Sequence, residues 1–244
     1  MTGSLRFFLA VLLSTCALGL FGASAALADD STSSDDAQLV DVSKQVGDVQ
    51  KKLDELISRG QSAKPGKLLS SAVCGYPDPS QNFLFWGDEA SYALAPEGDF
   101  SATDAWTLSK QATVVPTADP FSGAEQSLQL GHDGQAVTPA MCVTLDNPSF
   151  RFFTRDVGGN GKANLKVDVL YEDLDGHVKH LTIAKLKAGG EWQPSIVVPI
   201  YMNMLAAASP SGVTAVAFQF KAEGLQKDET LSISSFYVDP YCSR

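Results

Sequence analysis

Residues 165–172 (LKVDVLYE) decide the fold class, because apolar and polar side chains alternate along most of this stretch. The same period of two recurs in residues 216–220 (VAFQF). A period of two sends successive side chains to opposite faces of an extended strand, so that one face enters a core. Both stretches are therefore predicted to be strands of a sheet with one buried face.

Turn signals separate these strands from their neighbours. Asp175-Gly176 joins the first strand to a further run, residues 177–187, and both turn residues tolerate positive φ, which predicts a β-hairpin. Gly and Pro recur between other short predicted strands, a spacing that favours an all-β antiparallel sandwich or jelly roll. Residues 201–208 (YMNMLAAA) lack β-branched side chains and are predicted to form a short helix.

The first 28 residues have the features of a secretory signal peptide. Arg6 precedes the apolar run 7–13 (FFLAVLL), and the small residues Ala26 and Ala28 predict cleavage after Ala28. An uncleaved anchor helix and a lipoprotein signal ending at Cys16 are the alternatives. No later run approaches the ~20 apolar residues of a membrane span. The mature chain is therefore expected to be secreted and to lack a transmembrane segment.

Two segments of different character follow the signal. Residues 29–36 (DDSTSSDD) are polar and acidic and are predicted to be disordered. In residues 37–59, apolar side chains recur at alternating spacings of three and four from Leu39 to Leu56, which predicts an amphipathic helix. This 39–56 stripe either makes a short coiled coil through which two chains associate, or packs on the rest of the chain.

Three cysteines remain once the signal is removed. Residues 60–73 have the composition of a linker, and residues 74–244 are the predicted β-sandwich domain. Outside the cell, an odd number of cysteines predicts one disulfide and one unpaired thiol. The favoured pair is Cys74 with Cys142, and the alternative is Cys74 with Cys242. In the favoured pairing, Cys242 stays free or links two chains.

Charge excludes two classes of partner. The 244 residues contain 18 Lys and Arg against 28 Asp and Glu, a formal net charge of −10. This balance disfavours binding to the phosphates of a nucleic acid and attachment to anionic lipid. The hydrophobic content of 44% is sufficient to fill a core, which excludes a wholly disordered chain.

A series of short motifs carries a family resemblance. In chain order they are residues 98–100 (GDF), Trp106, 127–130 (SLQL), 139–143 (PAMCV), 150–153 (FRFF), the Asp175-Gly176 turn, Trp192, 216–220 (VAFQF) and 235–239 (SFYVD). Over residues 74–241 this order resembles galactose-binding-like jelly-roll domains used as carbohydrate-binding modules. It is more similar still to uncharacterised secreted proteins of high-GC Gram-positive bacteria, which share residues 86–92 and 237–240. The resemblance implies two antiparallel sheets, frequent glycan binding and, often, a structural calcium ion.

Candidate ligand-binding residues are aromatic. Sugar recognition needs an apolar ring face together with groups that hydrogen-bond hydroxyls. Trp86, Tyr92, Trp106 and Trp192 are the candidate rings, and Phe121 is a further candidate in a predicted loop. The alternative role of each ring is packing in the core.

A possible structural Ca²⁺ would be bound by acids. Calcium takes six to eight oxygen ligands, for which loop carbonyls and one or two carboxylates suffice. The acids that match the position implied by the resemblance are Asp99, Glu125 and Asp239. The alternative is that Asp99 caps a turn and that Asp239 ends a strand.

Catalysis is not expected, because the sequence shows no arrangement of nucleophile and base. Adjacent acids such as Asp88 and Glu89 are interpreted as solvated charges. The sequence therefore favours a secreted non-catalytic module that binds glycan or cell-wall carbohydrate. The alternative is a structural or protein-interaction module that dimerises through the N-terminal helix.

Overall fold

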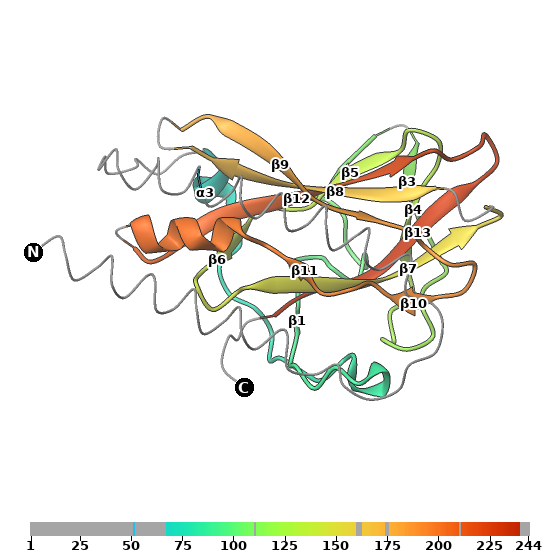
Figure 1. Ribbon diagram of the computed structural model, residues 1–244, viewed down its shortest axis with the longest axis horizontal. Helices are drawn as coiled ribbons and strands as arrows, with labels where there is room; N and C mark the ends of the chain where they lie inside the picture. The colour runs from blue at the N-terminus through green and yellow to red at the C-terminus, as the bar shows by residue number, and fades with distance from the viewer. Residues whose placement is uncertain are drawn as a thin grey trace, which may run out of the picture. The chain divides into compact units, whose positions relative to one another are not determined.

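The computed structural model describes residues 51, 67–109, 111–159, 163–173, 176–209 and 211–239 (Figure 1). In this part of the chain, two antiparallel sheets pack face to face. The elements in chain order are α3 (Lys67–Ser71), η1 (Leu84–Trp86), β1 (Ala93–Leu94), β2 (Thr107–Leu108), β3 (Ala112–Val115), β4 (Ser127–Leu130), β5 (Gln135–Val137), β6 (Met141–Val143), β7 (Ser149–Val157), β8 (Asn164–Glu172), β9 (Val178–Leu186), β10 (Gln193–Pro194), β11 (Val198–Pro199), η2 (Met202–Ala208), β12 (Thr214–Glu223) and β13 (Thr230–Val238).

Strands distant in the sequence are neighbours in both sheets. The seven-stranded sheet has the order β10-β7-β13-β4-β3, with β1 paired to β13 and β11 paired to β7. The six-stranded sheet has the order β2-β5-β12-β8-β9, with β6 paired to β12. Every pairing between these strands is antiparallel. The prediction of an all-β antiparallel jelly-roll sandwich is therefore confirmed.

Aromatic rings fill the space between the sheets. Phe150 and Phe152 of β7 face Phe218 and Phe220 of β12, and the ring centres of Phe150 and Phe218 are 4.6 Å apart. All four side chains are fully buried, which removes a large apolar area from water. The period of two along β7 and β12 accounts for this core, because alternate residues of each strand point inward.

Local predictions for the turn and the helix are confirmed. Strands β8 and β9 form the predicted hairpin, in which Gly176 has a φ of 78° and the Gly176 N–H donates to the Asp173 carbonyl at 3.0 Å. The predicted helix of residues 201–208 is the 3₁₀ helix η2, which buries Met202 and Ala206. Within the segment predicted as a linker, residues 67–71 form the short helix α3.

Several predictions for the N-terminal region lie outside the described residues. They are the signal peptide (1–28), the acidic tract (29–36), nearly all of the amphipathic helix (37–59) and the self-association through that helix. Cys242 also lies outside them. These remain predictions. Within the described residues, no helix has both the length and the apolar character needed to cross a membrane.

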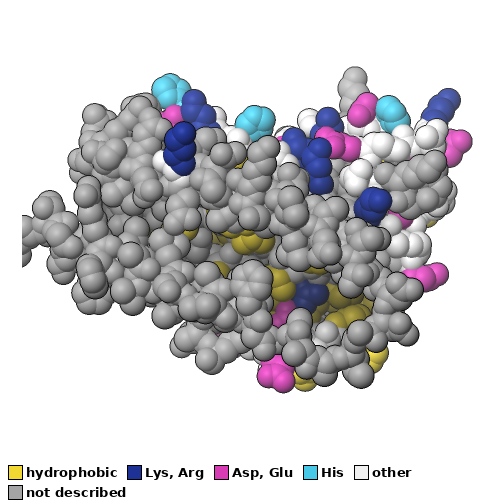
Figure 2. Space-filling model, viewed as in Figure 1, with side chains coloured by type: hydrophobic (Ala, Val, Ile, Leu, Met, Phe, Trp, Pro, Cys, Tyr) yellow, Lys and Arg dark blue, Asp and Glu magenta, His cyan; other side chains and the backbone are white. Residues whose placement is uncertain are grey.

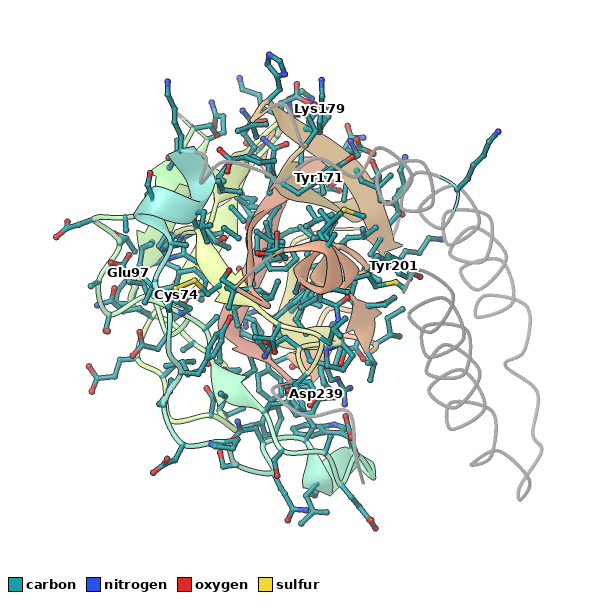
Figure 3. The ribbon with its side chains drawn as sticks, turned by 90° about the vertical axis from the view of Figure 1, so that its left-hand side faces the viewer. Cys74, Glu97, Tyr171, Lys179, Tyr201 and Asp239 are labelled. Carbon is teal, nitrogen blue, oxygen red and sulfur yellow. A yellow bond between two sulfur atoms is a disulfide. The ribbon has the colours of Figure 1, made fainter. Side chains whose placement is uncertain are left out.

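A disulfide joins Cys74 to Cys142, which confirms the favoured pairing (Figure 3). Their Cα atoms are 4.9 Å apart, and 68 positions separate them in the sequence. Close to this bond, the Val73 N–H donates to the Ala140 carbonyl and the Cys142 N–H to the Val73 carbonyl. The disulfide and these hydrogen bonds attach the start of the domain to β6.

Opening this disulfide is expected to lower the free energy of unfolding by about 2–4 kcal/mol, because the cross-link restricts the unfolded chain. Cys74→Ser is the appropriate variant, since Cys74 is exposed and little buried surface is lost with it. Urea unfolding of the oxidised proteins measures the change, and Cys242→Ser serves as the control. Peptide mapping without reductant that found Cys74 joined to Cys242 would contradict the assignment.

Candidate functional site

A second, smaller core covers part of the outer face of the seven-stranded sheet. Phe153 of β7 and Tyr237 of β13 point away from the main core and are covered by Phe83 and Tyr92. The Phe83 ring centre lies 5.1 Å from that of Phe153 and 5.7 Å from that of Tyr237. The chain from about residue 80 to 94 therefore folds back across this face, although a sheet of a sandwich commonly exposes its outer face to water.

An arginine on β7 anchors this covering segment. Arg151 is only 7% exposed, and its guanidinium donates to Asp88 Oδ2 at 2.7 Å. Its Nε and a terminal nitrogen donate to the Ser195 carbonyl at 3.0 and 2.6 Å. The guanidinium carbon also lies 4.3 Å from the centre of the Phe83 ring, within the range of a cation–π contact. Burial of the charge is thus balanced by an ion pair and a ring face.

The Asp88 carboxylate completes this arrangement. It accepts hydrogen bonds from the Tyr92 hydroxyl at 2.8 Å and from the Ala90 N–H at 3.0 Å. Burial acts to raise the pKa of Asp88, but these hydrogen bonds and Arg151 outweigh it and lower the pKa below its ordinary value. Burial and the bond to Asp88 raise the pKa of Tyr92. The interpretation of Asp88 as a solvated charge is therefore wrong, because a distant arginine pairs with it.

A second anchor holds the loop between β3 and β4 (residues 116–126). Asp119 is 3% exposed, and its carboxylate accepts hydrogen bonds from the hydroxyls of Ser122 at 2.6 Å and Ser234 at 2.8 Å, with the Ser235 hydroxyl oxygen 3.2 Å away. The backbone N–H groups of Phe121 and Ser122 also donate to it. Ser235 lies in a bulge of β13 with a φ of 52°. The bulge turns the Ser235 hydroxyl toward Ser122 and Asp119.

The turn before Asp99 depends on a glycine. The Ala95 N–H donates to the Phe236 carbonyl at 3.0 Å, and the Phe236 N–H donates to the Gly98 carbonyl at 2.9 Å. A Cβ at position 98 would overlap the Phe236 carbonyl oxygen, so only glycine allows this close approach. The Gly98-Asp99-Phe100 motif thus holds Asp99 beside β13.

A pocket of about 360 Å³ opens between these anchored segments. It is lined by Pro77, Asp78, Ser80, Asn82, Tyr92, Leu94, Asp99, Ser122, Gly123, Ala124, Ser235 and Tyr237. The lining combines two tyrosines with acids, an amide and hydroxyls. Burial raises the pKa of Tyr237, so its phenol stays neutral at ordinary pH. An apolar ring surface among convergent polar groups is typical of a small-molecule site.

The structure does not bring the predicted aromatic residues together at this pocket. Tyr92 lines it, but the Tyr92 side chain is otherwise buried in the second core. Trp106 lies in the main core beside Phe100 and is 6% exposed. Trp86 and Trp192 are half-buried against the second core. Packing is thus the main role of Trp106, because its ring lies against Phe100 and Phe220 in the main core.

The aromatic residues Phe121, Trp86, Trp192 and Phe85 lie outside the lining of the pocket. Phe121 is half-exposed, and its ring centre is 4.8 Å from that of Trp86. The Trp192 ring lies beneath the Arg155 guanidinium at 5.0 Å. The most exposed aromatic side chain among the described residues is Phe85, at 86%.

The three acids expected for calcium occupy different surroundings. Asp99 lines the pocket and accepts hydrogen bonds from the N–H and hydroxyl of Ser101. Asp239 is buried at the end of β13, which pairs with β1, and accepts a hydrogen bond from Ser149 (Figure 3). Glu125 is exposed in a loop. Among the described residues, no group of three His, Cys, Asp or Glu is arranged to hold a metal ion. The calcium site remains a prediction of the resemblance.

Sequence reasoning missed most of the lining. Asp78, Asn82 and Ser122 carry no motif, and Ser235 and Tyr237 belong to the 235–239 motif without having been singled out as ligand-binding residues. These residues lie on three segments that are distant in the sequence, which the folded-back segment and the β13 bulge bring together. The available signals were Tyr92 and the motifs 98–100 and 235–239.

Comparisons with known proteins give limited similarity. The sequence matches neither a protein-family profile nor a curated protein. The CBM22-1 xylan-binding domain of Paenibacillus barcinonensis Xyn10C is 15% identical with a TM-score of 0.40, over 57% of this chain and 86% of that domain. TmCBM61, solved with β-1,4-galactotriose, is 14% identical with a TM-score of 0.35, over 59% of this chain and 96% of that one.

A third similar structure belongs to a bacteriophage protein. The enzymatically active domain of tailspike protein 4 of bacteriophage CBA120 is 14% identical with a TM-score of 0.41, over 59% of this chain and 21% of that one. Similarity at these identities and TM-scores says nothing about the ligand of this chain. The sandwich fold rests on the strand pairing described above.

Removing the Arg151 guanidinium is expected to destabilise the domain. Arg151→Met keeps an extended side chain but leaves the Asp88 carboxylate, whose side chain is 12% exposed, without its cation. The free energy of unfolding should fall by roughly 3 kcal/mol. Urea unfolding measures this, and the double variant R151M/D88N should recover part of the loss because it removes the stranded charge. Equal stabilities of wild type and R151M would contradict the anchoring role.

The lowered pKa of Asp88 also predicts how stability changes in acid. An unfolded chain binds this proton near pH 4, whereas the folded domain binds it only at lower pH. The stabilisation by the charged form is complete above about pH 4 and is lost as the pH falls through the folded pKa. Asp88→Asn should therefore lose less stability than wild type between about pH 4 and pH 2. The exposed neighbour supplies the control, because Glu89→Gln should follow the wild-type curve.

Proposed function

We propose that this chain is a secreted, non-catalytic carbohydrate-binding module whose binding site is the pocket between β13, the folded-back segment and the β3–β4 loop. The observation that carries the proposal is the lining, which gathers Tyr237 with Asp78, Asn82 and Asp99, whereas Tyr92 is fully buried and forms part of the wall. A sugar presents C–H groups to a ring and hydroxyls to acids and amides. This combination matches both halves of that chemistry.

The pocket walls are held before any ligand arrives. The Arg151–Asp88 pair fixes the segment that contributes Tyr92, and the Asp119 hydrogen bonds fix the loop that contributes Ser122. Side chains that are already ordered lose little conformational entropy on binding. This rigidity supports a recognition role for the pocket.

The lining supports binding rather than reaction. Among the described residues, no histidine lines the pocket, and the Ser122 hydroxyl donates to Asp119, whose carboxylate also accepts hydrogen bonds from Ser234 and two backbone N–H groups. Glycoside hydrolysis needs two carboxyl groups placed on either side of the scissile bond. The two acids of the lining, Asp78 and Asp99, are proposed to hydrogen-bond sugar hydroxyls instead.

Export fits this function. The sequence features of a signal peptide support export of the mature chain from the cytoplasm to where glycans and cell-wall polysaccharides are accessible. A disulfide between Cys74 and Cys142 is compatible with an oxidising compartment.

Binding to a glycan panel tests the proposal. Xylan, β-1,4-galactan and purified cell-wall polysaccharides are suitable probes, with affinity measured by calorimetry or affinity electrophoresis. Asn82→Ala and Asp99→Ala should each weaken binding by about tenfold, because each removes a hydrogen-bonding group from the pocket. Asp104→Ala is the matched control, since Asp104 is exposed and outside the lining.

Two outcomes would contradict the proposal. The first is no binding to any glycan at sugar concentrations of about 1 mM. The second is binding that neither variant weakens, which would place the site elsewhere. Release of reducing sugar from any probe would contradict the non-catalytic assignment.

A further inference from the structure

Hydrogen-bond donors on one wall of the pocket are already used within the protein. The Ser80 hydroxyl donates to Asn82 Oδ1 at 2.7 Å, and the Asn82 amide nitrogen donates to the Tyr92 carbonyl at 3.3 Å. The Tyr92 hydroxyl donates to Asp88 at 2.8 Å. A hydroxyl carries a single proton, so neither Ser80 nor Tyr92 can donate to a ligand while these bonds persist.

On the opposite wall, the hydroxyls of Ser122 and Ser235 are likewise used within the protein. The Ser235 hydroxyl donates to Ser122 Oγ at 2.6 Å, and the Ser122 hydroxyl donates to Asp119 Oδ2 at 2.6 Å. Both protons point to protein acceptors that are buried or half-buried. A ligand that needs donors from the protein would have to break these bonds, at the free-energy cost of leaving a buried carboxylate less satisfied.

Acceptors remain free in the same lining. One carboxylate oxygen of Asp99, Oδ1, accepts hydrogen bonds from Ser101, whereas no described residue donates to Oδ2. No described residue donates to the Asp78 side chain. Ionised carboxylates only accept hydrogen bonds, and among the described residues no Lys, Arg or His lines the pocket to neutralise them. The pocket therefore combines negative charge with a surplus of acceptors.

Basic side chains lie elsewhere on the molecule. Lys166 of β8, Lys185 of β9 and Lys221 of β12 share a row on the outer face of the six-stranded sheet, because they are register partners. Figure 2 shows Lys, Arg and His side chains along the side where β8 and β9 lie. In the described part of the chain, these lysines therefore do not compensate the charge of the pocket lining.

We propose that the pocket selects a sugar that brings donors, and that it prefers a sugar with a protonated amino group over one with a hydroxyl at the same position. An ammonium group supplies three N–H donors and a positive charge to Asp78 and Asp99. A uronate or phosphate-bearing glycan brings acceptors and negative charge and is rejected. This inference rests on the proposed function and specifies the ligand class.

A matched series of β-1,4-linked tetrasaccharides tests the preference. Cello-oligosaccharide is the neutral parent, the glucosamine tetramer replaces the C2 hydroxyl by an amine, and the glucuronic acid tetramer replaces the C6 hydroxymethyl by a carboxylate. Calorimetry with the full mature chain, at a pH where the amine is protonated, should show the glucosamine tetramer binding about tenfold more tightly than the neutral parent. The glucuronate tetramer should bind more weakly than the parent.

Variants assign the preference to the two acids. In the double variant D78N/D99N, both positions keep an acceptor oxygen but lose their charge, so the ratio of glucosamine-tetramer affinity to neutral-tetramer affinity should fall from about ten towards one, whatever the change in neutral binding. The D104N variant controls for a general change of protein charge. In this variant the glucosamine tetramer should keep its full affinity advantage over the neutral tetramer. Thermal unfolding of each variant checks that the domain is folded. The amine advantage in wild type should also shrink as salt is raised.

The outcomes separate this inference from the proposed function. Binding of the neutral tetramer together with equal or tighter binding of the glucuronate would overturn the inference and leave carbohydrate binding intact. An amine advantage retained in D78N/D99N would also overturn it. Failure of every tetramer and of the wider glycan panel would contradict the proposed function itself.

Discussion

The ion pair between Arg151 and Asp88 is the interaction on which the outer face of the seven-stranded sheet depends. Alternation along β7 forces Arg151 outward when Phe150 and Phe152 point into the core. A guanidinium so deeply buried needs a carboxylate, and Asp88 provides it from a segment 63 positions away. This ion pair fixes the segment of residues 80–94 across the sheet and brings Tyr92 to the edge of the pocket.

The bulge of β13 has the complementary role on the other side of the pocket. A regular strand would alternate past Ser234 and Ser235, but the positive φ of Ser235 turns both hydroxyls toward Asp119. Positive φ at a residue other than glycine is unfavourable, so the surrounding hydrogen bonds must compensate for it. Strain of this kind commonly lies at functional sites, and here the strained residue is part of the pocket lining.

The fold could be predicted because its signals are local. The period of two in residues 165–172 and the Asp175-Gly176 turn act within a few positions and specify β8, β9 and their hairpin. The pocket could not be predicted, because it depends on pairings between distant residues. Nothing near Asp88 in the sequence indicates Arg151, and nothing near Ser235 indicates Asp119. Aromatic residues alone could not locate the pocket, since a ring such as Trp106 stabilises the core equally well.

The exposed rings also illustrate why polar chemistry, and not stacking, defines the candidate site. Phe85 and Trp86 are inclined at 80° to each other, and Trp86 and Phe121 at 90°. Successive units of a polysaccharide stack on rings that present their faces in a common direction, which edge-to-face rings do not provide. Selectivity in this chain is therefore expected to come from hydrogen bonds in the pocket. Hydrogen bonds discriminate between donors and acceptors on a sugar, whereas an aromatic ring packs against any apolar face of the sugar.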